Sequence, residues 1–324
     1  MGEAFAGRTV GKKAMLWGIL AQSIPDIDFL AAFWLPTADN LFAHRGITHS
    51  ILFALLITPF IAGLANYWHR PHNISFTRWF LFIGSVILIH IFIDAFNNYG
   101  VGWLEPFNHV RISFNSIYVA DPFFSIVPGL AFAGLLILQQ KQEIRKWIWR
   151  TGLIIPFLYL GYGLANRWYI AKETKEILSA KKINYNQLLI TPAPLQSWLW
   201  FVAAGTDSGF YTGYKSVFDS KPLIDFHFFP KNNFLREQVK DEVELNKMIR
   251  FSQQFYTLEK HADTFIINDL RFGQVIGWQN PAENFAFYFY LQPAIDNTLV
   301  VQRGRFAKWD KHSFFSLLSR IKGN

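Results

Sequence analysis

The chain has 324 residues and contains no cysteine, so disulfide bonds and thiolate metal ligands are both excluded. It also has no phosphate-binding glycine loop, no recognisable Ser-His-Asp arrangement and no internal repeat. The net charge of +8 is divided evenly between the two halves and is too diffuse to indicate a nucleic-acid partner. The sequence therefore argues against cysteine chemistry, nucleotide binding and nucleic-acid binding.

Charged residues are scarce in the first half of the chain. Residues 1–168 contain 12 Lys and Arg and 8 Asp and Glu, whereas residues 169–324 contain 19 and 15. A chain of this length accommodates two domains of ordinary size. The composition predicts a membrane-embedded domain over residues 1–168 and a soluble domain over residues 169–324. The first residues, Met1–Lys13, lack the charged-then-apolar order of a cleavable signal peptide.

Long apolar runs support the membrane assignment. Four of them have about the length that spans a bilayer, roughly 20 residues: 51–68, 79–96, 122–138 and 147–166. A fifth run, 14–35, is interrupted by Pro25, Asp26 and Asp28, and a break at membrane depth persists only where it is buried in protein or lines a wet cavity. A soluble all-helical core is the weaker alternative. We expect an α-helical polytopic membrane bundle of about five apolar helices, followed by a soluble α+β domain.

Basic residues between the runs predict the orientation of the bundle. Nine of them fall in one set of connections: Arg8, Lys12, Lys13, Arg70, Arg78, Lys141, Arg145, Lys146 and Arg150. The alternate connections contain only Arg45 and Arg111. By the positive-inside rule the first set is cytoplasmic, which places the C-terminal domain outside the cytoplasm. His69 and His72 lie in a cytoplasmic connection and are interpreted as surface residues.

Three short motifs place ionisable residues in or against these apolar runs. They are Pro25-Asp26-Ile27-Asp28, His44-Arg45-Gly46-Ile47-Thr48-His49-Ser50, and His90-Ile91-Phe92-Ile93-Asp94. All three fall toward the ends that face the outward connections. An ionisable group held in hydrocarbon is costly and needs a partner, so we interpret the six Asp and His residues as metal ligands and catalytic residues: Asp26, Asp28, His44, His49, His90 and Asp94.

Local spacing constrains how these residues meet. His90 and Asp94 are four residues apart and lie on one helix face, where they can share an ion or the carboxylate can orient the imidazole. His44 and His49 would diverge by about 140° on a regular helix. They converge only if Gly46 interrupts the helix or Thr48 caps its start, so we expect a loop that enters the next run at Ser50.

Each motif also has a simpler interpretation. A lone His on an apolar helix is usually a satisfied core residue, the two Asp residues resemble a helix cap, and His44 and His49 fit an interfacial loop. Together, six buried groups without an ion would leave several charges unpaired, which favours the metal site. Nitrogen and oxygen ligands without thiolate favour zinc, with manganese or iron as alternatives. Arg45 and Asn97 are weaker candidates for substrate contact, with a headgroup anchor as the alternative role for Arg45. Glu105, Arg111 and Asp121 are further weak candidates for the site.

The second half has the pattern of an α+β module. An amphipathic stretch, 169–182, continues the last apolar run. Segments 197–204 and 210–218 flank Gly205-Thr206-Asp207-Ser208-Gly209, which predicts a hairpin. A helix is expected over 233–256, strands over 264–272, 284–292 and 298–303, and a short helix over 311–321. This module could cover the membrane site or select a substrate.

The order of the motifs, with Phe96-Asn97-Asn98-Tyr99-Gly100 after the third, resembles the YdjM/YfhP-type family of inner-membrane proteins described as metal-dependent hydrolases. The likeness covers about residues 1–170, and the His-Arg-Gly-Ile-Thr-His-Ser motif is its most distinctive part. Members of that family begin with a stretch containing Asp and a Thr-His pair. This chain begins later, at Met1-Gly2-Glu3-Ala4, so we expect one ligand or supporting residue of the family pattern to be missing.

The residues and the resemblance together indicate a multi-pass inner-membrane hydrolase. Water activated by one or two divalent ions would attack an ester or phosphoester, and a site at the membrane surface favours a lipid or lipid-linked substrate. Two other classes stay open. A transporter should show paired repeats and a midplane site, which are not evident here. A non-catalytic scaffold or regulatory protein would keep the apolar helices and tolerate the loss of metal.

Overall fold

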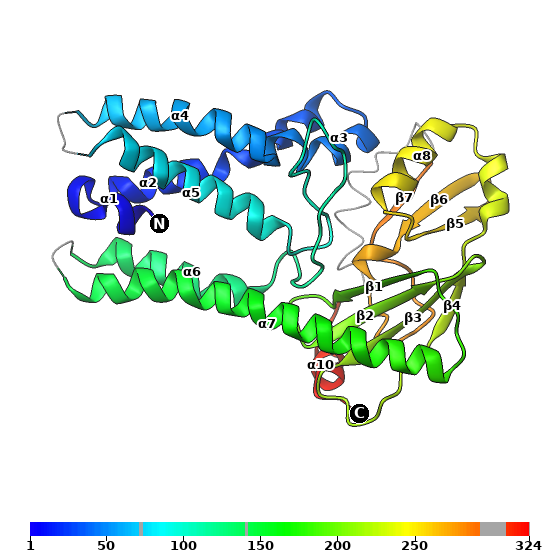
Figure 1. Cartoon of the computed structure of the whole chain (residues 1–324). Helices are drawn as coiled ribbons and strands as arrows, with labels where there is room; N and C mark the ends of the chain where they lie inside the picture. Colours follow the sequence, from blue (N-terminus) through cyan, green and yellow to red (C-terminus); the bar gives the residue numbers. More distant parts are fainter. Residues whose placement is uncertain (71–73, 140–141, 292–308, 324) are drawn as a thin grey trace. The chain divides into compact units, whose positions relative to one another are not determined.

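Figure 1 shows a computed structural model of the chain, which describes residues 1–70, 74–139, 142–291 and 309–323. The chain divides into two compact units. We call the first the helical unit; it comprises Met1–Leu35, Phe42–Phe114 and Val119–Tyr162. We call the second the sheet unit; it comprises Pro36–Leu41, Asn115–Tyr118 and Gly163–Asn324. The division falls inside one long helix.

Helices make up the first part of the chain. In order they are α1 (Gly2–Val10), α2 (Lys13–Ser23), the 3-10 helix η1 (Pro25–Phe33), α3 (Thr37–Ala43), the 3-10 turn η2 (Ile47–His49), α4 (Ile51–Trp68), α5 (Phe76–Asp94), α6 (Pro122–Ile137) and α7 (Ile144–Ala180). Side-chain caps begin three of the apolar helices: Ser50 accepts from the amide of Phe53, Ser75 from that of Arg78, and Asp121 from that of Phe123.

Among the described residues, α4, α5 and α7 are long and apolar enough to cross a membrane. The break expected at Pro25 is present: α2 and η1 are together long and apolar enough to cross a membrane, but they are bent by 53° relative to each other. If this bent pair counts as one span, the described residues contain four candidate spans. The helix α6 is not a fifth, because it has only 16 residues. The membrane character is thus supported, whereas the expected five spans are not confirmed.

Small side chains let the helices of the helical unit approach closely. The core of this unit contains six fully or nearly buried alanines, at positions 6, 14, 21, 54, 62 and 65, beside Trp79, Phe82 and Ile87. On α5, a Cβ atom at Gly84 would lie 3.1 Å from Cγ2 of Thr58 on α4. Small residues at interfaces are what helices need in a bilayer, where packing rather than water exclusion drives association.

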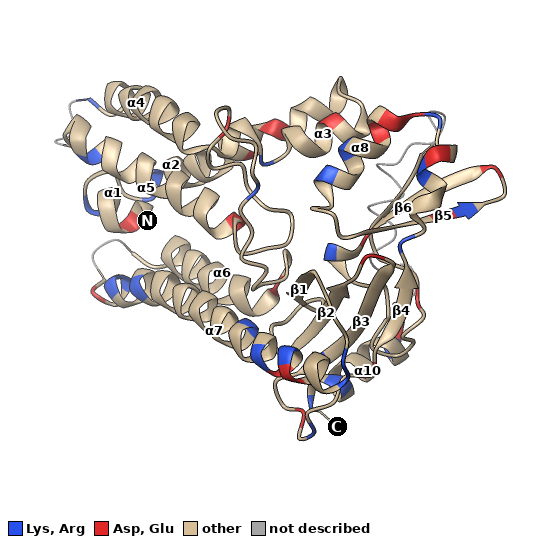
Figure 2. Cartoon of the chain, turned by 45° about the vertical axis from the view of Figure 1, so that its right-hand side comes forward, with Lys and Arg blue, Asp and Glu red and all other residues tan. Residues whose placement is uncertain are grey.

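Basic residues lie at one end of these helices. Figure 2 shows Lys and Arg at the end of the helical unit where α5 and α7 begin. There Arg145 of α7 pairs with Glu3 of α1, with 2.6 Å between Nη2 and Oε2. The surface interpretation of His69 was wrong: it is only 8% exposed, because Nε2 accepts a 2.8 Å hydrogen bond from the indole of Trp17 and the ring stacks on Trp79. His72 and Lys141 lie outside the described residues.

Two antiparallel sheets form the second part of the chain. The first contains β1 (Gln187–Pro192), β2 (Leu199–Gly205), β3 (Gly209–Ser216) and β4 (His227–Pro230) in sequence order. The second contains β5 (Tyr256–His261), β6 (Thr264–Asp269) and β7 (Tyr288–Tyr290), also in sequence order. The remaining elements are η3 (Asn233–Gln238), α8 (Glu242–Phe251), η4 (Leu270–Phe272) and α10 (Lys311–Ile321).

The first sheet is covered on both faces, which explains why every residue of β2 is buried. Trp200 and Val202 point to one face and form a cluster with Ile170 and Ile177 of α7. Phe201 and Ala203 alternate with them and contribute to a second cluster that contains Leu270, Phe285 and Leu317. The amphipathic stretch 169–182 therefore continues the last apolar helix, as expected, and its apolar face packs on the sheet.

Several expected elements of this half are confirmed. The hairpin joins β2 to β3, with Gly205 opposite Phe210, and α10 has the expected bounds. The prediction of a single helix over 233–256 was wrong. Asp241 caps a new helix, α8, by accepting a hydrogen bond from the amide of Glu244. The chain then turns after α8 at Gln253 and Gln254, which have φ angles of 52° and 70°. The strand expected over 298–303 lies outside the described residues.

Candidate metal centre

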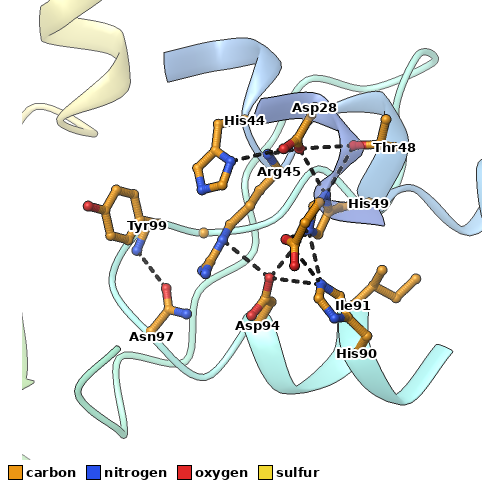
Figure 3. A network of polar contacts seen from close by, with 12 residues as sticks. Asp28, His44, Arg45, Thr48, His49, His90, Ile91, Asp94, Asn97 and Tyr99 are labelled. Carbon is orange, nitrogen blue, oxygen red and sulfur yellow. Dashed lines mark hydrogen bonds and ion pairs between the residues drawn. The ribbon is translucent and has the colours of Figure 1, made fainter. Parts of the chain in front are cut away.

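Four side chains from three separate segments meet at one end of α5. Asp26 comes from η1, His49 ends η2, and His90 and Asp94 occupy the last turns of α5. Each offers one ligand atom, and all four atoms lie within 4.8 Å of one another. We call these residues the four-ligand group. Figure 3 shows His49, His90 and Asp94 pointing toward one another.

The ligand atoms of the group lie 3.3–3.6 Å apart, which is longer than most hydrogen bonds and suits atoms that face a common ion. Nε2 of His49 lies 3.3 Å from Nε2 of His90 and 3.3 Å from Oδ2 of Asp94. Oδ1 of Asp26 is 3.5 Å from both imidazole Nε2 atoms. The pair predicted from helical spacing, His90 and Asp94, has 3.6 Å between Nε2 and Oδ2. Two imidazoles and two carboxylates thus present lone pairs to a shared space.

Local backbone structure brings the second motif to this space. α3 ends at Ala43, and the chain then turns at Gly46, where a Cβ atom would lie 2.6 Å from the carbonyl oxygen of Phe42. Ser50 caps α4, so His49 stands just before the helix rather than on it. The predicted interruption at Gly46 and entry at Ser50 are therefore present, with Ser50 rather than Thr48 as the cap.

Asp28 occupies a different place from Asp26. Its side chain is 4% exposed, and its carboxylate accepts hydrogen bonds from the backbone amide of Arg45 (2.8 Å) and from the hydroxyl of Thr48 (3.0 Å). Nδ1 of His44 lies 3.1 Å from Oδ1, and Nδ1 of His49 lies 3.2 Å from Oδ2. A proton on Nδ1 of His49 would face Asp28 and leave Nε2 free as a ligand.

His44 does not join the four-ligand group. Its side chain is 38% exposed and contacts Asp28 and the ring of Tyr99. Of the six residues singled out in the sequence, the structure brings four together as facing ligands. Asp28 contacts Nδ1 of His49, and His44 contacts Asp28.

Gln22 supports His90 from the opposite side. Its amide lies 2.9 Å from Nδ1 of His90. The amide nitrogen Nε2 of Gln22 faces Nδ1. A half-turn of the side-chain amide would present its carbonyl oxygen instead to a proton on Nδ1, as binding of an ion by Nε2 of His90 requires. Both imidazoles of the group therefore have a polar partner on Nδ1, which is the usual arrangement for histidines that bind metals.

The donor set fits a divalent ion. His49 is fully buried, and Oδ2 of Asp94 is buried without a hydrogen-bond partner among the described residues. Nε of Arg45 lies 3.2 Å from this oxygen without forming a hydrogen bond to it, so the oxygen keeps a lone pair that an ion could accept. The side chain of Asp26 is 51% exposed, so the group is open on one side. These residues can hold a metal ion at a site with an accessible position.

The weaker candidates lie outside the four-ligand group. Asn97 is buried and accepts a 3.0 Å hydrogen bond from the amide of Tyr99, which closes a turn after α5. Glu105 pairs with His109 at 2.8 Å. Arg111 donates to the backbone carbonyls of Phe42 and His44, and Asp121 caps α6 and accepts from Tyr159. These contacts shape the backbone around the site and give no support to a substrate role for Asn97.

Three residues near the site were not singled out in the sequence: Gln22, Thr48 and Tyr99. Gln22 carried a usable signal, because it is a lone amide in an apolar run close to Pro25. Thr48 was considered only as a cap, although its hydroxyl also lies 3.1 Å from Nδ1 of His49. Tyr99 was quoted only within the segment that follows the third motif, and nothing in the sequence marked it as a neighbour of Arg45.

Comparisons with known proteins concern mainly the helical part of the chain. Residues 1–170 match the family described as YdjM inner membrane protein, and this range contains the four-ligand group. Inner membrane protein YbcI of Escherichia coli (strain K12) is 26% identical over 159 residues, which are 48% of this chain and 87% of YbcI. An uncharacterized protein, YfhP of Bacillus subtilis (strain 168), is 26% identical over 207 residues, 61% of this chain and 58% of YfhP. No solved structure matches the chain.

Proposed function

Because the chain belongs to the YdjM inner membrane protein family and carries four converging ligands, we propose that it is a membrane-bound metal-dependent hydrolase. Its substrate would be an ester or a phosphoester, which water activated by the metal would cleave. The four-ligand group is the observation that carries this proposal. The domain assignment that goes with it is a hydrolase domain over residues 1–168 and a soluble domain over residues 169–324.

Within this proposal the six sequence candidates take two roles. Asp26, His49, His90 and Asp94 bind the ion, for which zinc is favoured and manganese or iron are alternatives. Asp28 orients His49 through Nδ1, and His44 in turn contacts Asp28. The four ligand atoms lie within 4.8 Å of one another, which supports a single ion rather than two.

When bound, a divalent ion lowers the pKa of a coordinated water toward neutrality and polarises the bond to be cleaved. The protein supplies the rest. His49 and His90 close the buried side of the group and exclude bulk water from it. Asp26, with half of its side chain exposed, lies on the open side, from which water and substrate would enter.

Apolar side chains beside the site support a lipid or lipid-linked substrate. η1, which carries Asp26 and Asp28, also carries exposed Phe29 and Phe33, and Trp34 follows it directly. Trp is enriched at the surface of a bilayer, where an amphiphilic substrate would present its polar group.

A comparison of metal-free and metal-loaded protein tests the proposed activity. The detergent-purified protein should hydrolyse at least one member of a panel of carboxylic esters and phosphoesters. Chelation should abolish the rate and a restored divalent ion should recover it. A folded, metal-loaded protein that hydrolyses no member of the panel would favour the non-catalytic scaffold instead.

We also propose that this is a multi-pass inner-membrane protein with its sheet unit outside the cytoplasm. The basic residues in the first turns of α5 and α7, such as Arg78 and Lys146, would then be cytoplasmic. A reporter fused after Asn324 should give an extracytoplasmic signal, and the same reporter inserted after Arg70 should give a cytoplasmic one. The reverse pair of signals would invert the orientation.

A further inference from the structure

Arg45 is buried beside the four-ligand group without the hydrogen bonds that its side chain requires. The residue is 8% exposed, and its Nε and Nη1 atoms have no hydrogen-bond partner among the described residues. A guanidinium group is always charged and offers five N–H donors. Burial of such a group without acceptors is costly, so its position calls for an explanation.

The neighbours of Arg45 match its charge but do not satisfy its donors. Nε lies 3.2 Å from Oδ2 of Asp94, yet that oxygen has no hydrogen bond either, so the two groups approach without hydrogen-bond alignment. The guanidinium carbon lies 5.3 Å from the centroid of the Tyr99 ring, which stabilises a cation but accepts little from its N–H groups. Figure 3 shows the side chain of Arg45 lying between Tyr99 and Asp94.

The backbone holds Arg45 in a rarely used conformation that delivers the side chain to this place. Its φ angle is 58°, in the left-handed region that residues other than glycine seldom adopt. Two hydrogen bonds fix it: its amide donates to Asp28 at 2.8 Å, and its carbonyl accepts from the amide of Gly102 at 2.9 Å. Strained residues held from both sides in this way tend to occur at ligand-binding sites.

A metal ion cannot supply what Arg45 lacks. An ion in the four-ligand group satisfies the lone pairs of Asp94, but it accepts no hydrogen bond from an N–H group. Asp28 is not available as an acceptor for the guanidinium, because its oxygens already receive Arg45 N and Thr48 and face His44 and His49. The missing partner is therefore an acceptor that arrives next to the ion.

We propose that the guanidinium of Arg45 binds the anionic oxygens of a phosphate group beside the four-ligand group. The inference rests on the proposed function and narrows its substrate class to phosphoesters. A phosphate group offers two adjacent oxygens that match the planar fork of a guanidinium, and its negative charge balances that of Arg45. A neutral carboxylic ester offers neither the second oxygen nor the charge.

Binding of inorganic phosphate to the metal-loaded protein tests this role without turnover. Arg45→Gln removes the charge while leaving a non-glycine residue at the strained position, and we expect it to weaken phosphate binding at least about tenfold. Arg45→Lys keeps the charge but loses the fork and should fall between Arg45→Gln and wild type. Arg78→Gln, an exposed residue of α5, is the matched control and should bind phosphate as the wild type does. Metal content should be the same in all four proteins.

Two results would overturn the proposal. Equal phosphate affinity in Arg45→Gln and wild type would mean that water is the acceptor for the guanidinium. Loss of metal in Arg45→Gln and Arg45→Lys would mean that Arg45 acts by positioning Asp94. If Arg45→Gln does not fold, Arg45→Lys carries the same comparison, since it should still bind phosphate more weakly than wild type at unchanged metal content.

Kinetics separate this inference from the proposed activity. Arg45→Gln should raise KM for phosphoesters by a larger factor than it raises KM for a neutral carboxylic ester. Parallel assays with phosphatidic acid in micelles and with a water-soluble phosphomonoester distinguish a lipid from a soluble source of the phosphate group. A higher KM in Arg45→Gln with either substrate supports the inference. Hydrolysis with no dependence on Arg45 would reject the inference and leave the hydrolase proposal standing. Phosphate binding that depends on Arg45, in a protein that hydrolyses nothing, would support the inference and reject the hydrolase proposal.

Discussion

Replacing His90 with alanine is expected to reduce the metal content of the purified protein at least about tenfold, because a direct ligand contributes more to affinity than its supporting partners do. His90 is buried and its Nε2 faces both His49 and Asp94 in the four-ligand group. Asp94→Asn should have a similar effect, since it keeps the shape of the side chain and removes the charge. Metal content per chain, measured by elemental analysis of detergent-purified protein, gives the result.

His109→Ala is the matched control for that experiment. His109 lies in the connection between α5 and α6 of the helical unit, its side chain is 60% exposed, and it pairs only with Glu105 among the described residues. It is a better control than His69, whose buried contact with Trp17 would disturb the packing. Equal metal in the His90, Asp94 and His109 variants, or none in the wild type, would remove the basis for the site.

Metal content should also depend on pH in a defined direction. An imidazole binds an ion only in its neutral form, so protons compete with the metal and the metal content should fall as the pH is lowered. Thermal stability should follow, because an ion that binds only the folded chain stabilises it by about 2.7 kcal/mol at a hundred times its Kd. The His90→Ala variant should show neither dependence.

Replacing His49 with alanine is expected to abolish metal-dependent hydrolysis, with a loss in kcat/KM of at least about a hundredfold. His49 contacts three carboxylates, Asp26, Asp28 and Asp94, so its removal takes away a ligand and the link to the orienting carboxylate together. The wild-type rate should rise with pH through the range in which the activated water ionises. The panel of esters that tests the activity also serves for this variant.

The helices should survive the change at His49. The core of the helical unit is built from apolar residues such as Ala62, Ala65 and Phe82, none of them a member of the four-ligand group, so far-ultraviolet circular dichroism of His49→Ala should match the wild type. His109→Ala should retain full activity. Undiminished hydrolysis by a folded His49→Ala protein would reject the mechanism, whatever the metal content.

Predictions from the sequence succeeded where a local signal decided the structure. α4 has the predicted bounds because Ser50 caps an uninterrupted apolar run. The last helix was predicted to its exact bounds for a similar reason, since Asp310 caps it through the amide of Ser313. β4 was not predicted: it has only 4 residues, His227–Pro230, and forms because β3 is available to pair with it. A strand that depends on its partner leaves little trace in its own sequence.

The same distinction applies to the candidate site. The i and i+4 spacing of His90 and Asp94 on a helix was enough to bring them together. Asp26 and Asp28 were treated as equivalent, but they lie on a 3-10 helix with three residues per turn, which directs side chains two residues apart to different sides. Asp26 therefore faces the other members of the four-ligand group, whereas Asp28 faces Thr48 and the backbone of Arg45. The left-handed conformation of Arg45 depends on a contact with Gly102, which no local pattern could indicate.

The convergence of three distant segments also has a consequence for how the protein is made. Asp26 and His49 are synthesised and inserted well before His90 and Asp94 arrive on α5. Until α5 packs against α2 and α4, the early residues have no complete set of partners and must remain hydrated, since their burial alone is costly. We therefore expect the ion to bind late in biogenesis, as a mark of a correctly assembled bundle. An insertion intermediate that ends before α5 should be unable to retain it.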